Sequence, residues 1–131
     1  MNQKTFLPEL EAVRKIQDYV SGCLPADYQR PEKLGQIELI VEEVVINIVN
    51  HAFSDVENGF IKVGVEGKAS LEIEIRDNGR PFNPLEMADP DVDAPLDERE
   101  PGGLGIFFVR QLSAEVTYLR EAGNNVLRLV L

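Results

Sequence analysis

Three stretches of the chain place apolar residues at the three- and four-residue spacing of amphipathic helices. The first runs from Glu9 to Leu24 and ends before Pro25, and the last runs from Leu104 to Glu115. The second and longest runs from Pro31 to Phe53. Apolar positions in the first are Leu10, Val13, Ile16, Val20 and Leu24, and those in the second are Leu34, Ile37, Val41, Val44, Val45, Ile48 and Ala52. Each such helix has a face that must pack against a core.

Other segments alternate apolar and polar residues with the period of two that is typical of β-strands. The predicted hairpins pair Phe60–Glu66 with Leu71–Asp77 across Gly67-Lys68, and Val116–Arg120 with Val126–Leu131 around Gly123-Asn124. The pattern is also compatible with a short strand near Thr5-Phe6-Leu7. Together these elements predict an α/β fold, a two-layer α/β sandwich. In it, a mostly antiparallel sheet has one face covered by about three helices and the other face in water.

A chain of 131 residues and 14.7 kDa is long enough for one domain with a substantial core, so we expect a single domain over residues 1–131. The one compositional break is Asn83 to Pro101, which holds four prolines and seven acids. This composition predicts a long loop. Because the loop joins two of the motifs described below, we expect a lid at about residues 85–101, with a solvated surface loop as the alternative.

Charge and cysteine content narrow the range of partners. The formal net charge of −10 and pI near 4.5 argue against binding to nucleic acid or to an anionic membrane. No apolar run approaches the roughly 18 residues of a spanning helix, and the first residues lack a signal-peptide pattern. Cys23 is the only cysteine, so no intrachain disulfide can form and a cytoplasmic location fits best.

The second helix carries a polar seam on the side opposite its core face. The seam consists of Gln36, Glu43, Asn47 and Asn50, and apolar residues flank it. A polar seam with apolar borders resembles the floor of a pocket, in which Glu43 could act as a general base and Asn47 as an oxygen ligand of Mg²⁺. The alternative is an amphipathic helix with its polar side in water.

Asp77 is unusual because it continues the apolar parity of its strand. Leu71, Ile73 and Ile75 share one face, so Asp77 should point with them toward the helices. An inward carboxylate needs hydrogen-bond donors, and the amino group of a purine can supply one. Asn78-Gly79 is equally compatible with ordinary turn chemistry at the end of a strand.

A run of glycines, Gly102-Gly103-Leu104-Gly105, precedes the third helix. Glycines allow a ligand to approach the backbone closely, and a helix start presents unpaired N–H groups to an anion. The run does not match the P-loop pattern, which also requires Lys and Ser or Thr after the last glycine. Taken alone, a glycine-rich turn before a helix is a weak signal for phosphate.

Together the three motifs resemble those of the Bergerat-fold (histidine kinase-like) ATPases. Glu43-x-x-x-Asn47-x-x-x-His51-Ala52 resembles their N-box, Asp77-x-Gly79-x-Pro81-Phe82 their first glycine box, and Gly103-x-Gly105 their second. The compact length and the sequence around the glycine boxes are most similar to those of the anti-sigma-factor serine/threonine kinases. The similarity extends from about Leu34 to the C-terminus.

The resemblance implies a role for each motif residue. Glu43 would be the catalytic base, and Asn47 would be the Mg²⁺ ligand. Asp77 would bind the adenine amino group, and Gly79 would make room for the ring. The helix-start residues that would bind the phosphates are Gly103, Leu104 and Gly105. The chain departs from the family at Ile48, where a small residue is usual, and at Asn124-Asn125, where many relatives have a threonine that assists adenine recognition.

The function that the resemblance implies is ATP- and Mg²⁺-dependent transfer of phosphate to a serine or threonine of a small anti-sigma-factor antagonist. Such a kinase also sequesters a sigma factor. A non-catalytic ATP/ADP-dependent protein-binding module is the alternative, and the presence of Glu43 favours the kinase because a pure binder needs no base. The sequence leaves a homodimer open and gives no sign of direct nucleic-acid or membrane contact.

Overall fold

One antiparallel sheet organises the computed structural model, which describes residues 1–67, 69–86 and 103–131. The strands lie in the order β1-β2-β3-β5-β4, and each neighbouring pair is antiparallel. Their bounds are β1 Asn2–Phe6, β2 Ile61–Gly67, β3 Leu71–Asp77, β4 Glu115–Glu121 and β5 Asn124–Val130. The central strand β3 carries alternating apolar residues whose side chains are completely buried.

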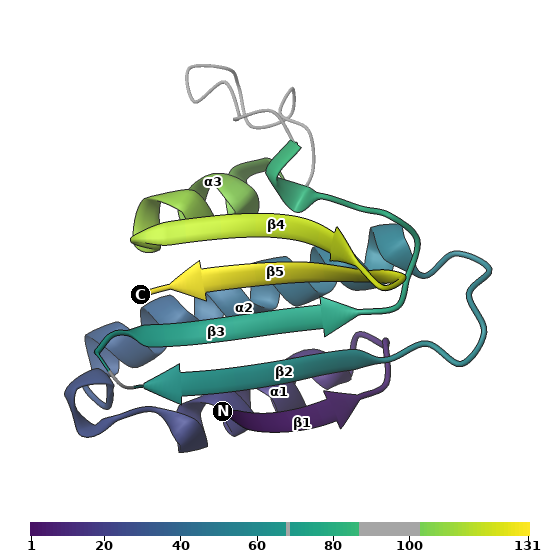
Figure 1. Ribbon diagram of the computed structural model, residues 1–131. Coiled ribbons are helices and arrows are strands. Elements are labelled where there is room, and N and C mark those ends of the chain that lie inside the picture. The colour runs from purple at the N-terminus through teal and green to yellow at the C-terminus, as the bar shows by residue number, and fades with distance from the viewer. Residues whose placement is uncertain (68, 87–102) are drawn as a thin grey trace.

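Three helices within the described residues cover one face of this sheet (Figure 1). Their bounds are α1 Ala12–Cys23, α2 Pro31–Ala52 and α3 Gly103–Leu112. The helix α2 lies between α1 and α3, and it runs behind the central strands. Its apolar face forms the core together with the inner faces of β2, β3 and β5. The prediction of a two-layer α/β sandwich with about three helices on one face is confirmed.

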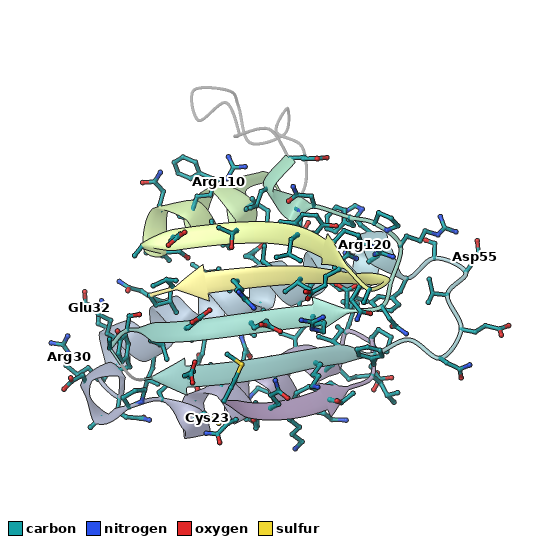
Figure 2. The ribbon with its side chains drawn as sticks, viewed as in Figure 1. Cys23, Arg30, Glu32, Asp55, Arg110 and Arg120 are labelled. Atoms are coloured by element: carbon teal, nitrogen blue, oxygen red, sulfur yellow. The ribbon has the colours of Figure 1, made fainter. Side chains whose placement is uncertain are left out.

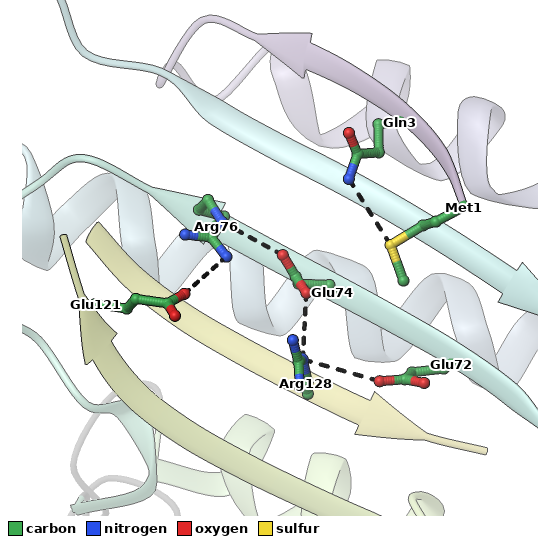
Figure 3. Close-up of polar contacts among 7 residues, drawn as sticks. All are labelled: Met1, Gln3, Glu72, Glu74, Arg76, Glu121 and Arg128. Atoms are coloured by element: carbon green, nitrogen blue, oxygen red, sulfur yellow. Dashed lines mark hydrogen bonds and ion pairs between the residues drawn. The ribbon is translucent and has the colours of Figure 1, made fainter. Parts of the chain in front are cut away.

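The other face of the sheet carries a network of charged side chains (Figure 3). Arg76 Nε lies 3.3 Å from Glu74 Oε1, and its terminal nitrogen lies 3.1 Å from Glu121 Oε2. Arg128, which pairs with Glu74 across β3 and β5, places its Nε 3.2 Å from Glu74 Oε2. Glu74 and Glu121 therefore have arginine partners on the outer face, and Glu74 is itself buried, with 9% of its surface exposed. The pair between Arg76 and Glu121 has an exposed carboxylate, and such a pair contributes little to stability, about 0–1 kcal/mol.

Several element boundaries differ from those that the pattern predicted. The first helix begins at Ala12 rather than Glu9, because Leu7 to Glu11 form turns, and Leu10 is exposed instead of packed in the core. The third helix ends at Leu112, since the Ala114 N–H already bonds to the Val130 carbonyl of the sheet. The turn of the last hairpin is Ala122-Gly123, one residue earlier than expected.

Two further short helices lie in the connections that the structure describes. The 3₁₀ turn Ala26–Tyr28 joins α1 to α2, and the 3₁₀ turn Pro84–Glu86 begins the segment that was expected to be a loop. The remainder of the expected lid, residues 87–101, lies outside the described residues. In the part of the chain that the structure describes, no helix combines the length and apolar content needed to cross a bilayer.

The fully buried side chain of Ile75 on β3 provides a test of the core. Ile75→Ala should lower the free energy of unfolding by about 2–5 kcal/mol, because it removes buried methyl groups and leaves a cavity. Thr117→Ala on the exposed side of β4 is the matched control and should change it by less than about 0.5 kcal/mol. Urea denaturation measures both, and equal unfolding midpoints would contradict the assigned core.

Candidate functional site

The polar seam of α2 is divided between two environments. Asn47 is buried, with 3% of its surface exposed, whereas Asn50 lies on the exposed side of the helix. Glu43 and Gln36 are half-buried. Ile40, one of the apolar residues beside the seam, belongs to the core. The buried part of the seam is therefore centred on Glu43 and Asn47, whereas Asn50 is exposed.

Asn47 presents an unused oxygen. Its Nδ2 donates to the Glu43 carbonyl one turn earlier, at 2.7 Å. Among the described residues, no donor bonds to Oδ1. A carbonyl-type oxygen at such a position suits a hard cation such as Mg²⁺.

Glu43 and Gly105 bring the first and third motifs into contact. A Cβ atom on Gly105 would collide with the carboxylate of Glu43, so with any other residue at 105 the Glu43 side chain would have to leave its present position. Gly105 lies in the first turn of α3, where backbone N–H groups remain unpaired by the helix. The side chain of Glu43 thus lies beside the helix start that was predicted to bind phosphate.

The Glu43 carboxylate has a raised pKa. The first cause is desolvation by burial, and the second is the like charge of neighbouring Glu42. No hydrogen-bond donor among the described residues reaches this carboxylate and offsets the two effects. A carboxylate of raised pKa is a stronger proton acceptor than an exposed one, as a general base requires.

Asp77 points inward, as its parity predicted, and 1% of its surface is exposed. Its Oδ1 accepts hydrogen bonds from the Gly79 N–H and from Asn125 Nδ2, both at 2.9 Å. Within the described residues, Oδ2 has no partner. Desolvation by burial raises the Asp77 pKa, although these two bonds and the charge of Arg120 lower it in part. The carboxylate is therefore fixed through one oxygen and offers the other as an acceptor.

Asn125 is a buried residue beside Asp77 whose contacts the sequence alone did not reveal. Its Nδ2 also donates to the Arg80 carbonyl at 2.7 Å. Its Oδ1 accepts from the Phe82 N–H at 3.0 Å, from the Tyr118 hydroxyl at 2.5 Å and from Arg120 at 3.1 Å. The signal that could have located it is the pairing register of β3 with β5, which sets Asn125 directly opposite Asp77.

The turn after Asp77 rests on the C-terminal end of α2. A Cβ atom on Gly79 would collide with the Ala52 carbonyl and side chain, and the Arg80 N–H bonds to that carbonyl at 2.7 Å. Asn78 fixes the loop beyond α2, because its Oδ1 accepts from the Phe60 N–H at 2.7 Å. The described contacts that require glycine at 79 are therefore with Ala52.

Neighbouring side chains complete this end of the molecule. The rings of His51 and Phe82 stack with centroids 5.1 Å apart. Arg120 lies at the end of β4 near the turn into β5, and it bonds to the Gly79 carbonyl at 2.9 Å (Figure 2). Arg110 on α3 donates to the carbonyl of Leu85, so α3 is joined to the 3₁₀ turn that follows the second motif.

Most of the predicted site residues therefore lie along α2 and its neighbours. Glu43 and Asn47 lie one turn apart and Glu43 contacts Gly105, while Asp77 and Gly79 lie near the end of the same helix. Gly103 and Leu104 begin α3, and the Leu104 side chain lies outside the described residues. The described residues contain no group of three His, Cys, Asp or Glu side chains that could hold a metal by themselves.

The fold and these contacts agree with one class of protein. The family model of the histidine kinase-like ATPase domain matches residues 6–131, and the chain belongs to this family. The expected resemblance to histidine kinase-like ATPases is confirmed. Membership of an ATPase domain family implies binding of ATP or ADP.

Curated relatives in this family are protein kinases. The serine/threonine-protein kinase BtrW of Bordetella bronchiseptica is 30% identical over 94 residues, which cover 71% of this chain and 66% of BtrW. The serine-protein kinase RsbW of Oceanobacillus iheyensis is 30% identical over 98 residues, covering 70% and 61%. RsbW of Staphylococcus aureus is 29% identical over 119 residues, covering 86% and 75%. The chain thus spans about two thirds of the length of the first two relatives.

Solved structures agree on the fold. The histidine kinase domain of the blue-light activated histidine kinase from Erythrobacter litoralis EL346 has a TM-score of 0.57 at 20% identity, covering 93% of this chain and 59% of that one. A second structure of this kinase has a TM-score of 0.61 at 22% identity, covering 93% and 40%. At such identity the likeness establishes the shared architecture.

The raised pKa of Glu43 predicts how stability depends on pH. The folded protein binds the proton of the Glu43 carboxyl more tightly than the unfolded chain does. At a pH below both pKa values the side chain is neutral in both states, so it does not lower the free energy of unfolding. Stability is lost as the pH rises from the unfolded pKa through the folded one, where the buried charge forms. The neutral, isosteric Glu43→Gln should therefore raise the melting temperature at about neutral pH, and the gain should shrink toward about pH 4.

Melting curves across this pH range measure the effect, with Glu57→Gln in the exposed loop after α2 as the control. The control should leave the melting temperature unchanged at every pH. If Glu43→Gln lowers the melting temperature at neutral pH, the carboxylate is stabilised by contacts that the described residues do not include.

Proposed function

We propose that this chain is an ATP-dependent serine/threonine protein kinase that phosphorylates a small anti-sigma-factor antagonist and sequesters a sigma factor. The observation that carries the proposal is the meeting of the three motifs around α2. The Glu43 carboxylate, to which no donor among the described residues bonds, lies against the glycine turn of α3. A second carboxylate, Asp77, lies near the end of α2, and one of its oxygens has no partner among those residues. The similarity to BtrW and RsbW supports the same class of reaction.

The purine would be recognised by Asp77. Its Oδ2 is an acceptor that lacks a partner among the described residues, and the exocyclic amino group of adenine is a matching donor. Guanine carries a carbonyl oxygen at the same ring position. That oxygen and the Asp77 carboxylate are both acceptors, so no hydrogen bond could form between them. An unpaired buried acceptor is costly, so this contact favours adenine over guanine.

The divalent cation would be bound by Asn47 together with the nucleotide. Its Oδ1 is the right kind of ligand, while the described residues offer no complete protein cage. Mg²⁺ commonly keeps one or two protein ligands and completes its shell with phosphate oxygens and water. When bound, the ion neutralises charge on the transferring phosphoryl group. The Asn47 amide is held in register for this role by its bond to the Glu43 carbonyl.

Glu43 would accept the proton of the attacking hydroxyl. Phosphoryl transfer breaks the bond between the terminal phosphorus and its bridging oxygen and forms a bond to the serine or threonine oxygen, whose proton passes to the Glu43 carboxylate. The raised pKa makes Glu43 a better acceptor at neutral pH. Its position beside Gly105 puts it next to the backbone N–H groups of the first turn of α3, which suit an anion.

Asp77→Asn tests the nucleotide site. It should weaken ADP binding about ten- to a hundredfold, because an amide nitrogen cannot accept the bond from the adenine amino group and the misplaced bond costs about 1–3 kcal/mol. The preference for ADP over GDP should narrow at the same time, since an amide can donate to the guanine oxygen. Calorimetry with both nucleotides measures these effects, and exposed Asp27→Asn is the control. Equal ADP affinity for wild type and Asp77→Asn would exclude Asp77 from the site.

Variants of α2 separate a kinase from a binding module. Glu43→Ala should keep ATP affinity within a few-fold and slow phosphate transfer about 10²–10⁴-fold, because only the base is lost. Asn47→Ala should lower both Mg²⁺-dependent affinity and rate, since it removes a ligand of the cation. Single-turnover transfer from radiolabelled ATP to antagonist proteins of the same genome measures the rate.

Two results of these assays would overturn parts of the proposal. If Glu43→Ala transfers phosphate as fast as wild type, another group takes the proton. If the wild type binds ATP but transfers to no antagonist, the chain is a nucleotide-dependent binding module.

A further inference from the structure

We propose that Asn125 is a positioning residue, locked by Tyr118 and Arg120, which sets the orientation of Asp77 and makes no direct contact with the purine. The inference rests on the proposed nucleotide site and adds the side chains that determine its selectivity. It differs from the expectation for the family, in which a threonine near this position assists adenine recognition directly.

The orientation of the Asn125 amide is determined by its neighbours. The Phe82 N–H and the Arg120 guanidinium can only donate, so the atom facing them at 3.0 and 3.1 Å must be the oxygen. The Arg80 carbonyl can only accept, so the atom facing it at 2.7 Å must be the nitrogen. A flipped amide would set donor against donor and acceptor against acceptor. The nitrogen therefore faces Asp77.

The same contacts saturate the amide. Both hydrogens of Nδ2 are used, one by Asp77 Oδ1 and one by the Arg80 carbonyl. Three donors converge on Oδ1, which has two lone pairs. Asn125 is also buried, with 3% of its surface exposed. No donor or acceptor of this side chain remains for a ligand unless a bond within the network breaks.

Strand pairing accounts for the assembly of this network. Asp77, Asn125 and Arg120 lie directly opposite one another on β3, β5 and β4. Side chains in such a row share one face of the sheet, and Tyr118, two residues before Arg120, shares that face as well. Arg120 also holds the Gly79 carbonyl at 2.9 Å, and the Gly79 N–H is the second donor to Asp77 Oδ1. Arg120 thereby supports both groups that direct the carboxylate.

One consequence separates positioning from direct binding. If Asn125 acts through Asp77, weakening the network should affect only ligands that use Asp77 Oδ2. ADP carries the 6-amino group that would bond to this oxygen, whereas purine riboside 5′-diphosphate is the same molecule without it. A direct purine ligand would instead lose affinity for both.

Tyr118→Phe removes one hydroxyl from the network, and Tyr28→Phe is the matched control. The Tyr28 hydroxyl also donates a single bond of 2.9 Å, but to the Leu131 carbonyl rather than to Asn125. Tyr118→Phe should weaken ADP binding about three- to tenfold, as expected for one neutral hydrogen bond, and leave the purine riboside diphosphate within twofold of wild type. Tyr28→Phe should change neither affinity. Asn125→Asp replaces both donor hydrogens with an acceptor. It should weaken ADP binding more than Tyr118→Phe does, and it should again affect ADP more than the purine riboside diphosphate.

Calorimetry gives these affinities, and equal losses for the two ligands in Tyr118→Phe, or no loss for either, would overturn the proposal. A measurement without nucleotide tests the Asn125 network independently of the proposed function. The side-chain NH₂ signals of Asn125 and the backbone signal of Gly79 in NMR spectra should shift in Tyr118→Phe and not in Tyr28→Phe. If wild type binds no ADP, the nucleotide site is wrong, and unchanged signals would overturn the network itself.

Discussion

Burial of the Asp77 carboxylate is the constraint on which this end of the molecule depends. A carboxylate with 1% of its surface exposed loses its hydration, and desolvation is the largest influence on its pKa. Two donors offset part of that cost, and each requires a particular piece of structure. The Gly79 N–H requires a turn that rests against Ala52 at the end of α2, which only glycine permits. The Asn125 amide requires the register of β3 and β5.

The two carboxylates of the candidate site differ in how they are compensated, and this difference suits two roles. Asp77 accepts two hydrogen bonds on one oxygen and lies near the charged Arg120, so its position is fixed. Its other oxygen, which has no partner among the described residues, can act as an acceptor. Glu43 has neither among the described residues, and burial with the like charge of Glu42 raises its pKa. Burial raises the pKa of both acids, so what distinguishes them is their hydrogen bonds: Asp77 is held in place by two donors, and Glu43 is held by none among the described residues.

Much of this arrangement could be predicted from the sequence because it follows from local periodicity. The parity of β3 placed Asp77 inward, and the spacing on α2 set Glu43 and Asn47 one turn apart. Long-range contacts could not be predicted in that way. The contact between Gly105 and the Glu43 carboxylate depends on how closely α3 packs on α2, and the bonds of Asn125 depend on residues from three strands. Leu10 shows a failure of the local pattern. Its spacing placed it on the core face of the first helix, but the helix begins after it, at Ala12, and Leu10 is exposed.

An asparagine at position 125 connects parts of the site that a hydroxyl could join only in part. A threonine side chain has one donor hydrogen, so it could bond to Asp77 or to the Arg80 carbonyl but not to both. The amide bonds to both, and its oxygen also accepts from the Phe82 N–H. The backbone of residues 80–82 is therefore held by the same side chain that orients Asp77. Because the Leu85 carbonyl shortly beyond this stretch accepts a hydrogen bond from Arg110 of α3, the same segment connects the candidate purine acceptor to the helix beside Glu43.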